Sequence, residues 1–377
     1  MRATLTGDRA ERVEILQPSA ERVAAPCPHF GDCGGCALQH WAREPYLAWK
    51  TEQIREALAR ERIETELLAP ITTEPGARRR LALHARRLGG RVTLGFKARR
   101  SWRLVEIDVC PIAMPQLQAA LPALKRLAAP FLEHAKSAPT LHVTWTDDGL
   151  DVDVTGVEAR SGGLSADARV RAAAVAAEID AARVTLASDI LYQARQPTVR
   201  LGPAVVALPP GAFLQAVAEA EAAMAAIAVR AVEGAKRVAD LFCGVGAFSL
   251  RLAEVASVQA ADSSAPAVRA MMAASGTAGL KAITAEARDL ARRPMLAEEM
   301  KRLDAAVFDP PRGGAVEQAR QLARSRLERV VGVSCNPATF ARDARILVDG
   351  GFRLRAVTPV DQFLWSPHVE LVGVFER

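Results

Sequence analysis

The sequence has no run of 18 apolar residues free of charge and proline, and its first residues alternate charges instead of forming an apolar signal core. It therefore offers neither a membrane span nor a secretion signal, and we expect a cytoplasmic protein. With only six cysteines in 377 residues, it also lacks the cysteine content of a disulfide framework. Half of the residues are hydrophobic and 24% are charged, which is typical of a globular chain with two or three domains.

The few cysteines are unevenly placed. Cys27, Cys33 and Cys36 lie within ten residues of one another in a glycine-rich segment, and Cys110 supplies a fourth thiol. Four thiolates are enough to close a four-iron four-sulfur cluster or to hold a structural zinc ion, and the spacing alone leaves both alternatives open. Either metal would attach the irregular segment 27–40 to the strand that precedes Cys110.

The patterning divides the chain into three regions. Residues 1–25 show little regular pattern and are interpreted as an arm, whereas residues 26–202 mix helices and strands as an α+β domain does. Over residues 203–377 helices and strands alternate strictly, which predicts an α/β domain with a parallel, doubly wound sheet. The last two strands, 353–359 and 369–375, form a hairpin that we expect to add an antiparallel strand to that sheet.

The periodicity also predicts individual elements in these regions. Apolar residues at helical spacing define the helices, and runs rich in β-branched residues between turn signals define the strands. The expected helices include 46–60, 117–135, 213–232 and 247–254, and the expected strands include 141–154 and 238–242.

Residues 78–103 form the clearest electrostatic feature of the chain, whose formal net charge is +6. Two strand-like runs joined at Gly89-Gly90 predict a β-hairpin, and the segment contains ten Lys or Arg residues and no acidic residue. Because Phe96 and Trp102 are available for stacking on bases, the pattern favours contact with looped or single-stranded RNA. The alternative is a solvated strand face, which is the usual place for a run of charges.

Open α/β sheets bind ligands at the carboxyl ends of their strands, and three predicted strand ends carry marked residues. The first, Asp240-Leu241-Phe242-Cys243-Gly244-Val245-Gly246, enters a glycine turn, with Ser249 where a dinucleotide fingerprint has its third glycine. The second is Asp262, whose carboxylate can accept both hydroxyl hydrogens of a ribose. This layout of acid, Gly-x-Gly and second acid is that of S-adenosylmethionine sites. The alternative is a glycine turn that serves only helix packing.

The third strand end is Asp309-Pro310-Pro311-Arg312. Two prolines fix the backbone and cannot extend the ladder of a strand, so the strand stops there and the carboxylate lies over the edge of the sheet. The alternative is an aspartate with only a capping role. The two other strand ends that carry marked residues favour a ligand site instead.

The segment Ser334-Cys335-Asn336-Pro337 places a thiol between a strand and a helix. Asn336 is a good N-cap and Pro337 suits the first helical position, so the amides of the helix N-terminus should point toward Cys335. That field is expected to lower the pKa of the thiol and to favour a reactive thiolate. The alternative is a buried, inert cysteine, which is also our interpretation of Cys243 in the glycine turn.

An acidic residue opens the last predicted strand, in His368-Val369-Glu370, and Glu370 is a candidate general base. A thiolate, a methyl donor and a base in one cleft suit substitution at a weakly nucleophilic carbon such as C5 of uracil. Addition of the thiolate at C6 makes an enolate, C5 then takes the methyl group, and the base removes the C5 proton so that the thiolate can leave.

These motifs, in this order, resemble the RNA uridine-5-methyltransferases, and in particular their bacterial iron–sulfur branch, which modifies 23S ribosomal RNA. The resemblance runs from about residue 26 to residue 377. It is carried by Cys27-Pro28-x-Phe30-x-x-Cys33-Gly34-Gly35-Cys36-x-Leu38-Gln39-His40, Phe213-x-Gln215, Asp240 to Gly246, Asp309-Pro310-Pro311-Arg312, Ser334-Cys335-Asn336-Pro337-x-Thr339-x-x-Arg342-Asp343 and His368-Val369-Glu370.

The resemblance implies a Rossmann-like S-adenosylmethionine methyltransferase domain at the C-terminal end and an iron–sulfur and RNA-binding domain before it. It implies a nucleophile at Cys335 and a base at Glu370, and it favours a four-iron four-sulfur cluster over zinc on the four cysteines named above. The S-adenosylmethionine contacts that it implies are Gln215, Phe242, Gly244, Asp262 and Asp309.

The chain departs from the family pattern at several positions. Val217 and Ala274 stand where the family often has asparagine, Ala247 replaces a frequent polar residue, and Asp262 is shorter than the usual glutamate. The family also commonly carries an N-terminal RNA-binding barrel called TRAM, and the arm 1–25 leaves room for no more than its last strand.

The resemblance makes ribosomal RNA the expected substrate. We also expect a monomer. Two alternatives stay open. One is a transfer-RNA uridine methyltransferase, whose better-known bacterial members lack the cysteine cluster. The other is a catalytically inactive iron–sulfur protein that keeps the fold as an RNA-binding platform.

Overall fold

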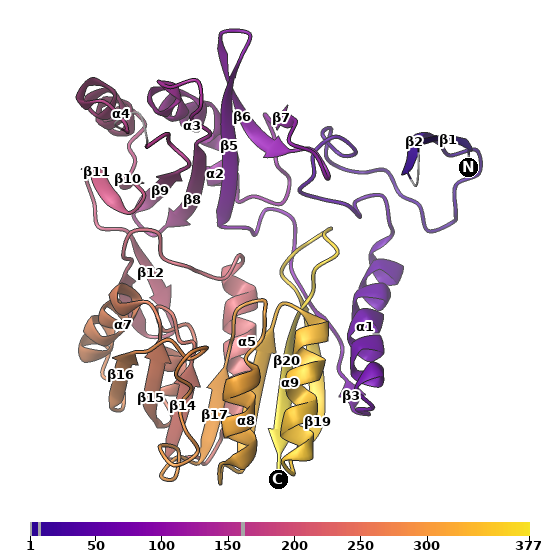
Figure 1. The fold of residues 1–377 in the computed structure, drawn as a ribbon, viewed down its shortest axis with the longest axis vertical. Coiled ribbons are helices and arrows are strands. Elements are labelled where there is room, and N and C mark those ends of the chain that lie inside the picture. The colour runs from indigo at the N-terminus through magenta and orange to yellow at the C-terminus, as the bar shows by residue number, and fades with distance from the viewer. Residues whose placement is uncertain (1, 7–8, 160–162) are drawn as a thin grey trace.

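The computed structural model of the chain describes residues 2–6, 9–159 and 163–377. Two large sheets dominate the fold, one of nine strands and one of seven, and they lie at opposite ends of the molecule (Figure 1). The α/β class with mixed sheets agrees with the sequence-based prediction. None of the helices in the described ranges has the length and apolar character that a membrane crossing would need.

The nine-stranded sheet contains the predicted parallel core. Strands β14 to β18 run parallel, and β20 lies antiparallel between β18 and β19, which confirms the antiparallel strand expected from the final hairpin. In spatial order the strands are β16 (Ile283–Ala287), β15 (Ser257–Asp262), β14 (Arg237–Leu241), β17 (Ala305–Phe308), β18 (Arg329–Ser334), β20 (Glu370–Glu376), β19 (Arg353–Asp361) and β3 (Glu66–Leu67), with β4 (Ile71–Thr72) also paired to β19.

Helices cover both faces of this sheet, so its strands are buried on both sides, as parallel sheets require. One face packs against α1, α8 and α9, and the other against α5, α6 and α7. The helices span Arg43–Arg60 (α1), Ala218–Ala231 (α5), Ser249–Leu252 (α6), Ala265–Thr277 (α7), Val316–Arg324 (α8) and Pro337–Asp349 (α9).

Two of these helices are shorter than predicted. Helix α5 begins at Ala218 instead of residue 213, because tertiary hydrogen bonds hold the preceding backbone extended; the Arg79 N–H, for example, donates to the Ala216 carbonyl at 2.9 Å. Helix α6 is a single turn instead of covering 247–254, since the loop before it uses Gly246 at φ +96°.

The seven-stranded sheet contains the predicted basic hairpin, with both turn glycines at positive φ. The predicted strand 141–154 is in fact two strands, β8 and β9, and the predicted helix 117–135 is broken into short pieces that each begin at or next to a proline. The sheet order is β11 (Asp189–Gln193), β10 (Arg183–Leu186), β9 (Gly149–Thr155), β8 (Thr140–Thr146), β5 (Arg80–Leu88), β6 (Arg91–Lys97) and β7 (Leu104–Glu106).

Helices α2 (Pro115–Ala119), α3 (Leu121–Ala128) and α4 (Ala166–Glu178) and the 3₁₀ turn Pro130–Leu132 pack on the seven-stranded sheet and close its core. A separate two-stranded ribbon, β12 (Thr198–Leu201) with β13 (Ala204–Ala207), packs instead on the core of the nine-stranded sheet.

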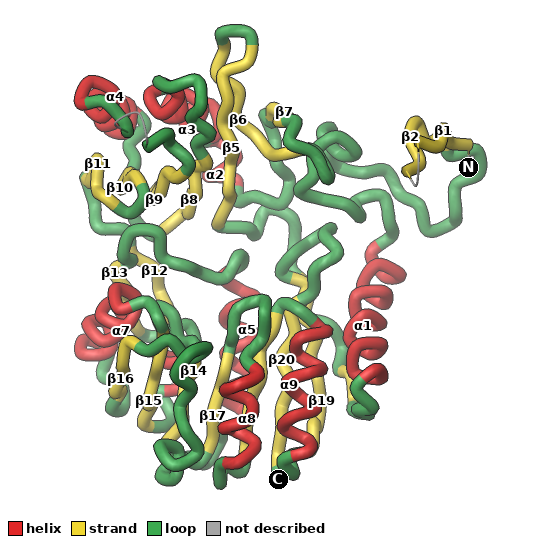
Figure 2. Tube along the Cα trace, viewed as in Figure 1, coloured by secondary structure: helices red, strands yellow, loops and turns green. Residues whose placement is uncertain are grey.

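Along the sequence, an N-terminal segment packs on the nine-stranded sheet before the first strand of the seven-stranded sheet begins. The hairpin of β1 (Arg2–Thr6) and β2 (Arg9–Glu14) stands apart from both sheets in Figure 2. Residues 43–72, which the sequence pattern groups with 26–202, pack on the nine-stranded sheet through α1 and through the pairing of β3 with β19. The segment that leads into the seven-stranded sheet is therefore itself packed on the nine-stranded sheet.

A buried ion pair anchors α1 to the end of β19. The Lys50 and Asp361 side chains are each only 2% exposed, and the Lys50 ammonium donates to Asp361 Oδ1 and, at 3.1 Å, to the Phe363 carbonyl. The Tyr46 hydroxyl donates to the same carboxylate oxygen at 3.0 Å and accepts the Trp365 N–H at 2.9 Å. These bonds hold the loop 362–369, which joins β19 to β20, against α1.

Replacing Lys50 by Met keeps the length of the side chain but leaves the Asp361 carboxylate buried without its cation. We expect this change to lower the free energy of unfolding by about 3–5 kcal/mol, because a broken buried pair leaves an uncompensated charge. Urea denaturation followed by circular dichroism measures the change.

The control for Lys50→Met is Lys125→Met, which removes the half-exposed pair of Lys125 with Glu106. An exposed pair contributes no more than about 1 kcal/mol. Equal losses of stability in the two variants would contradict the structural role assigned to Lys50.

Candidate active site at the strand ends

The marked residues of the sequence meet at one edge of the nine-stranded sheet. Strands β14, β17 and β18 end there, and β20 begins there because it runs antiparallel, with Leu371 paired to Ser334. Cys335, which follows β18, and Glu370, which opens β20, therefore lie on adjacent strands. The strand order reverses at β14 and β17, which is where such sheets form a ligand crevice.

The glycine turn after β14 has the backbone that its sequence predicts. Gly244 and Gly246 have φ of +54° and +96°, and Phe242 also adopts a positive φ, of +66°. A Cβ on Gly246 would lie 2.6 Å from Met271 Cγ, so the second glycine of the Gly-x-Gly turn packs against α7. A Cβ on Gly244 would instead meet open space, so the backbone of this glycine is open to the approach of a ligand.

Hydrogen bonds hold the two acidic residues beside the turn, Asp262 and Asp240. Asp262 accepts the Gly244 N–H at 2.9 Å and the Ser264 N–H at 2.7 Å, which orients its carboxylate at the end of β15. Ser249, which replaces the third glycine, donates its hydroxyl to Asp240 at 2.5 Å. Burial raises the pKa of Asp240 to about 7. Asp240 therefore supports the turn from beneath.

Four side chains form a continuous hydrogen-bonded chain at this edge of the sheet. Gln215 Nε2 donates to Asp309 Oδ2 at 3.1 Å, and Gln362 Nε2 donates both to Gln215 Oε1 at 2.8 Å and to Glu370 Oε2 at 2.7 Å. Two amides thus join the two carboxyl groups. Gln362 is the member that the sequence motifs missed, and the only signal for it was its place directly after β19.

Burial controls the protonation of both acids. It raises the pKa of Glu370 to about 8, with the charge of Asp309 acting in the same direction and the Gln362 hydrogen bond acting against it. It also raises the pKa of Asp309 to about 7, with Asp240 adding to the rise and Gln215 opposing it. Both groups can therefore exchange protons near neutral pH, as a catalytic acid or base must.

Cys335 has the predicted local structure but not the predicted pKa. Asn336 caps α9 by accepting the Ala338 N–H at 3.1 Å, and Pro337 occupies the first turn. Burial nevertheless raises the pKa of the Cys335 thiol, and the charges of Glu370 and Asp309 add to the rise, while Arg312 opposes it. The expectation of a lowered pKa is wrong, because desolvation and the two acids outweigh the helix N-terminus.

The remaining motif residues hold the loop after β17 against α9. Asn336 Nδ2 and the Thr339 hydroxyl both donate to the Arg312 carbonyl at 3.3 Å. Asp343, which is 2% exposed, accepts the Ala315 N–H at 2.7 Å, and Arg342 donates to the Gly313 carbonyl at 3.0 Å. These contacts fix the position of Asp309 relative to Cys335.

Other predicted site residues have simpler surroundings. Cys243 is 3% exposed, and burial raises its pKa well above the ordinary value, which agrees with a packed, inert thiol. Val217 and Ala274, where the family often has asparagine, are both buried in the apolar core. Phe213 is exposed in the loop before α5, with the Arg80 guanidinium 5.0 Å from its ring centre.

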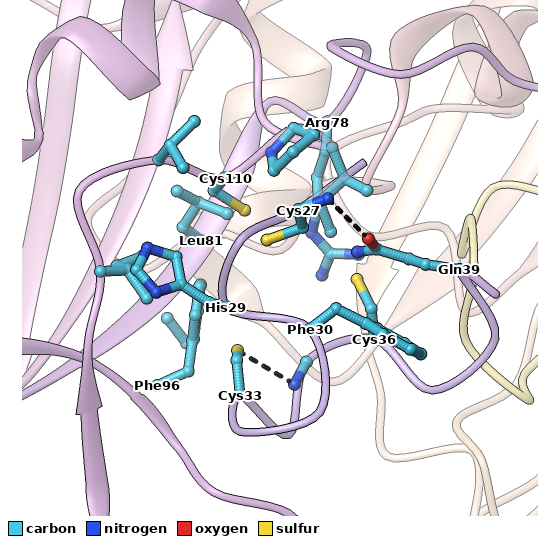
Figure 3. A pocket seen from close by; sticks show the side chains of 16 residues that line it. Cys27, His29, Phe30, Cys33, Cys36, Gln39, Arg78, Leu81, Phe96 and Cys110 are labelled. Carbon is cyan, nitrogen blue, oxygen red and sulfur yellow. Dashed lines mark hydrogen bonds between the residues drawn. The ribbon is translucent and has the colours of Figure 1, made fainter. Parts of the chain in front are cut away.

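The four cysteines assigned to a metal line a single cavity of about 250 Å³, together with Leu81 of β5 and Phe96 of β6 (Figure 3). Cys33 Sγ accepts the Gly35 N–H at 3.4 Å, and the Cys27 N–H donates to Gln39 Oε1 at 3.1 Å. Burial raises the pKa of Cys110 to about 12. Within the described ranges, no three His, Cys, Asp or Glu side chains are already grouped as ligands of one metal ion, so the four thiols share the cavity without converging on one point.

The basic residues of 78–103 divide into two groups. Arg79 is buried, where it pairs with Glu221 of α5 at 2.7 Å, and Arg80 donates to the Leu214 carbonyl, so these arginines connect the two large sheets. Trp102 is 85% exposed, with the Lys97 ammonium 4.1 Å from its ring centre. The exposed basic side chains of the segment are Arg87 and Arg91, next to the glycine turn, and Arg99, Arg100 and Arg103, between β6 and β7.

Comparisons with known proteins agree with this geometry. The family model for tRNA (uracil-5-)-methyltransferase matches residues 203–377. A protein of Caulobacter vibrioides described as an uncharacterized RNA methyltransferase is 64% identical over the whole chain, which covers 92% of that protein. The 23S rRNA (uracil(1939)-C(5))-methyltransferase RlmD of Halomonas elongata is 32% identical over 98% of the chain and 80% of its own length.

A solved structure supports the fold over the full length. It is that of the Pyrococcus abyssi tRNA (uracil-54, C5)-methyltransferase in complex with S-adenosyl-L-homocysteine, which matches with a TM-score of 0.74 at 22% identity and covers 100% of this chain and 92% of that one. Taken with the matches in sequence, these findings show that the chain is an RNA methyltransferase and belongs to the RNA (uracil-5-)-methyltransferase family.

Proposed function

We propose that this enzyme transfers a methyl group from S-adenosylmethionine to C5 of a uridine in RNA, through a covalent adduct between Cys335 and C6 of the uracil. The observation that carries the proposal is the position of Cys335 and Glu370 at the ends of adjacent strands, with Asp309 close enough to shift the pKa of both. Nucleophile, base and cofactor end of the sheet share one crevice.

The residues of the crevice suit S-adenosylmethionine. Asp262 is oriented for the ribose hydroxyls, and Gly244 leaves the space that a close approach to its backbone needs. We assign the remaining contacts to Phe242, Gln215 and Asp309, as the family resemblance implies. When bound, the cofactor supplies the methyl group at a sulfonium centre.

The chain's own residues carry the rest of the reaction. The Cys335 thiol releases its proton to solvent water, and the thiolate sulfur bonds to C6, so that the electron pair of the C5–C6 double bond becomes available at C5. After C5 is methylated, Glu370 takes the C5 proton. The freed electron pair restores the double bond while the C6–S bond breaks, which returns the thiolate. The raised pKa of Glu370 suits a group that takes a proton from carbon and releases it near neutral pH.

We propose 23S ribosomal RNA as the substrate, because the relative RlmD acts on it and is similar over almost the whole chain. The exposed arginines and Trp102 of the β5–β6 hairpin region would contact phosphates and bases of that RNA. Transfer RNA is a second candidate, favoured by the description of the matching family model. The three regions 1–25, 26–202 and 203–377 would then serve as arm, RNA and metal domain, and catalytic domain.

We propose a four-iron four-sulfur cluster on Cys27, Cys33, Cys36 and Cys110. Four thiols line one cavity, and a four-iron cube with a thiolate at each corner needs more room than one tetrahedral zinc ion. Apolar side chains beside the thiols, such as Phe96, would shield such a cluster from water. Bound there, the cluster would tie the segment 27–36 to the chain after β7.

Cys335→Ala should abolish formation of a covalent complex with RNA that contains 5-fluorouridine. In the wild type this RNA traps the adduct, because fluorine replaces the C5 hydrogen and leaves no proton for the base to remove. A gel shift that survives denaturation measures the complex, with 23S ribosomal and transfer RNA fragments compared side by side. Cys243→Ala, at the buried thiol outside the reaction, should trap as the wild type does. Equal trapping by Cys335→Ala would refute the nucleophile.

Glu370→Gln should transfer the methyl group but fail to release the RNA, since an amide cannot take the C5 proton. We expect turnover to fall by about 10²–10⁴-fold, the usual contribution of a general base. Single-turnover assays with labelled methyl donor would find the label in a protein–RNA adduct. Rapid multiple turnover by the variant would exclude Glu370 as the base.

Protein purified without oxygen should absorb at roughly 400 nm, the region of sulfur-to-iron charge transfer. Cys33→Ser should lose most of this absorbance together with the bound iron and sulfide, whereas Cys243→Ser should keep both. A colourless protein with one equivalent of zinc would instead favour the structural zinc site.

A further inference from the structure

Gln362 joins the base to the rest of the site, although no sequence motif marks it. The side chain is 1% exposed and lies in the loop directly after β19. Its Oε1 accepts the Ala216 N–H at 3.2 Å, and its Nε2 donates to Glu370 Oε2 at 2.7 Å and to Gln215 Oε1 at 2.8 Å. All of its polar atoms are therefore engaged.

The orientation of this amide follows from its partners. A backbone N–H can only donate, so the atom facing Ala216 must be the carbonyl oxygen of Gln362. The NH₂ group then faces Glu370 and Gln215. Turning the amide over would place its NH₂ against the Ala216 N–H and its oxygen against Gln215 Oε1, so both of these hydrogen bonds would be lost.

We propose that Gln362 is the positioning residue for proton removal: its Nε2–H holds Glu370 Oε2, which leaves Oε1 as the atom that takes the proton from C5 of uracil. The inference rests on the proposed function, since it assumes that Glu370 is the base. In that step the C5–H bond breaks, the proton joins Glu370 Oε1, the electron pair forms the C5–C6 double bond, and the C6–S bond breaks toward Cys335.

The hydrogen bond also sets when Glu370 can act. Burial and the Asp309 charge raise the pKa of Glu370 to about 8, and the donor from Gln362 opposes them because it stabilises the charged carboxylate. Without that donor the pKa would rise further, and less of the base would be ionised at neutral pH. Proton removal would then be slowed at pH 7 and recover as the pH rises through the new pKa.

The other charged groups around Glu370 do not replace this donor. On the neighbouring elements, the acids Asp361 and Glu221 have cationic partners of their own in Lys50 and in Arg79 and Arg251. At the Glu370 end of the strand, the titratable and charged groups on the surrounding elements are Asp309, Cys335, Arg312, His368, Asp361 with Lys50, and Glu221 with Arg79 and Arg251. Arg329, Arg353 and Arg355 lie at the other end of β20, beside Glu376.

Gln362→Met tests the proposal, because methionine fills a similar volume and donates nothing. With unmodified RNA, we expect methyl transfer within about twofold of the wild type, but release of the Cys335 adduct slowed by roughly tenfold at pH 7, the loss expected for one hydrogen bond to a charged group. At pH 9 the difference should shrink to about twofold. Rapid-quench assays that separate methylated free RNA from methylated adduct measure both steps.

The matched control is Gln318→Met, at a buried glutamine of α8 whose side chain, among the described residues, bonds to the Met295 backbone at 2.9 and 3.1 Å. It should show no pH-dependent change in release. A purely structural role for Gln362 would slow both steps equally at both pH values, and that result, or wild-type release at pH 7, would overturn the inference. Glu370→Gln separates the cases: if it stalls at every pH while Gln362→Met does not respond to pH, the base stands and only the role of Gln362 fails.

Discussion

The buried contact of Lys50 with Asp361 is the constraint on which the active site depends. It joins a helix that follows the cysteine segment to the end of β19, and from there the loop 362–369 leads to Glu370. Since Ala37 and Leu38 both donate backbone N–H groups to the Trp365 carbonyl, at 2.9 and 3.0 Å, the same loop is bound to the segment that carries the thiols. The base is therefore held by residues more than 300 positions before it.

Desolvation gives the crevice its chemistry. Burial raises the pKa values of Glu370, Asp309 and Cys335 together, and each carboxylate raises those of its neighbours further. The two glutamine amides, 215 and 362, separate the acids and donate to both, so one largely buried network supplies an ionisable base near neutral pH. A thiol in these surroundings must give up its proton as the substrate binds, because its thiolate is not favoured beforehand.

The basic hairpin shows how tertiary contacts divide a uniform sequence pattern. The segment 78–103 contains ten basic residues that the sequence does not distinguish. Arg79 pairs with the buried Glu221 and connects the two sheets, whereas Arg99 and Arg100, at the turn after Lys97, are exposed. Burying a guanidinium requires a carboxylate beside it, and that carboxylate lies 142 positions away on α5. A charge count along the chain cannot find such a partner.

The sequence by itself determined the parallel sheet, its final antiparallel strand and the strand ends that carry Asp262, Asp309, Cys335 and Glu370, because local periodicity and turn chemistry specify strands and the ends of parallel strands share one edge. Only the tertiary structure decided that α5 begins at Ala218, after an extended segment, that the pKa of Cys335 is raised and that Gln362 lies beside Glu370. Each of these depends on desolvation or on hydrogen bonds between segments far apart in the chain, and no local pattern encodes such contacts.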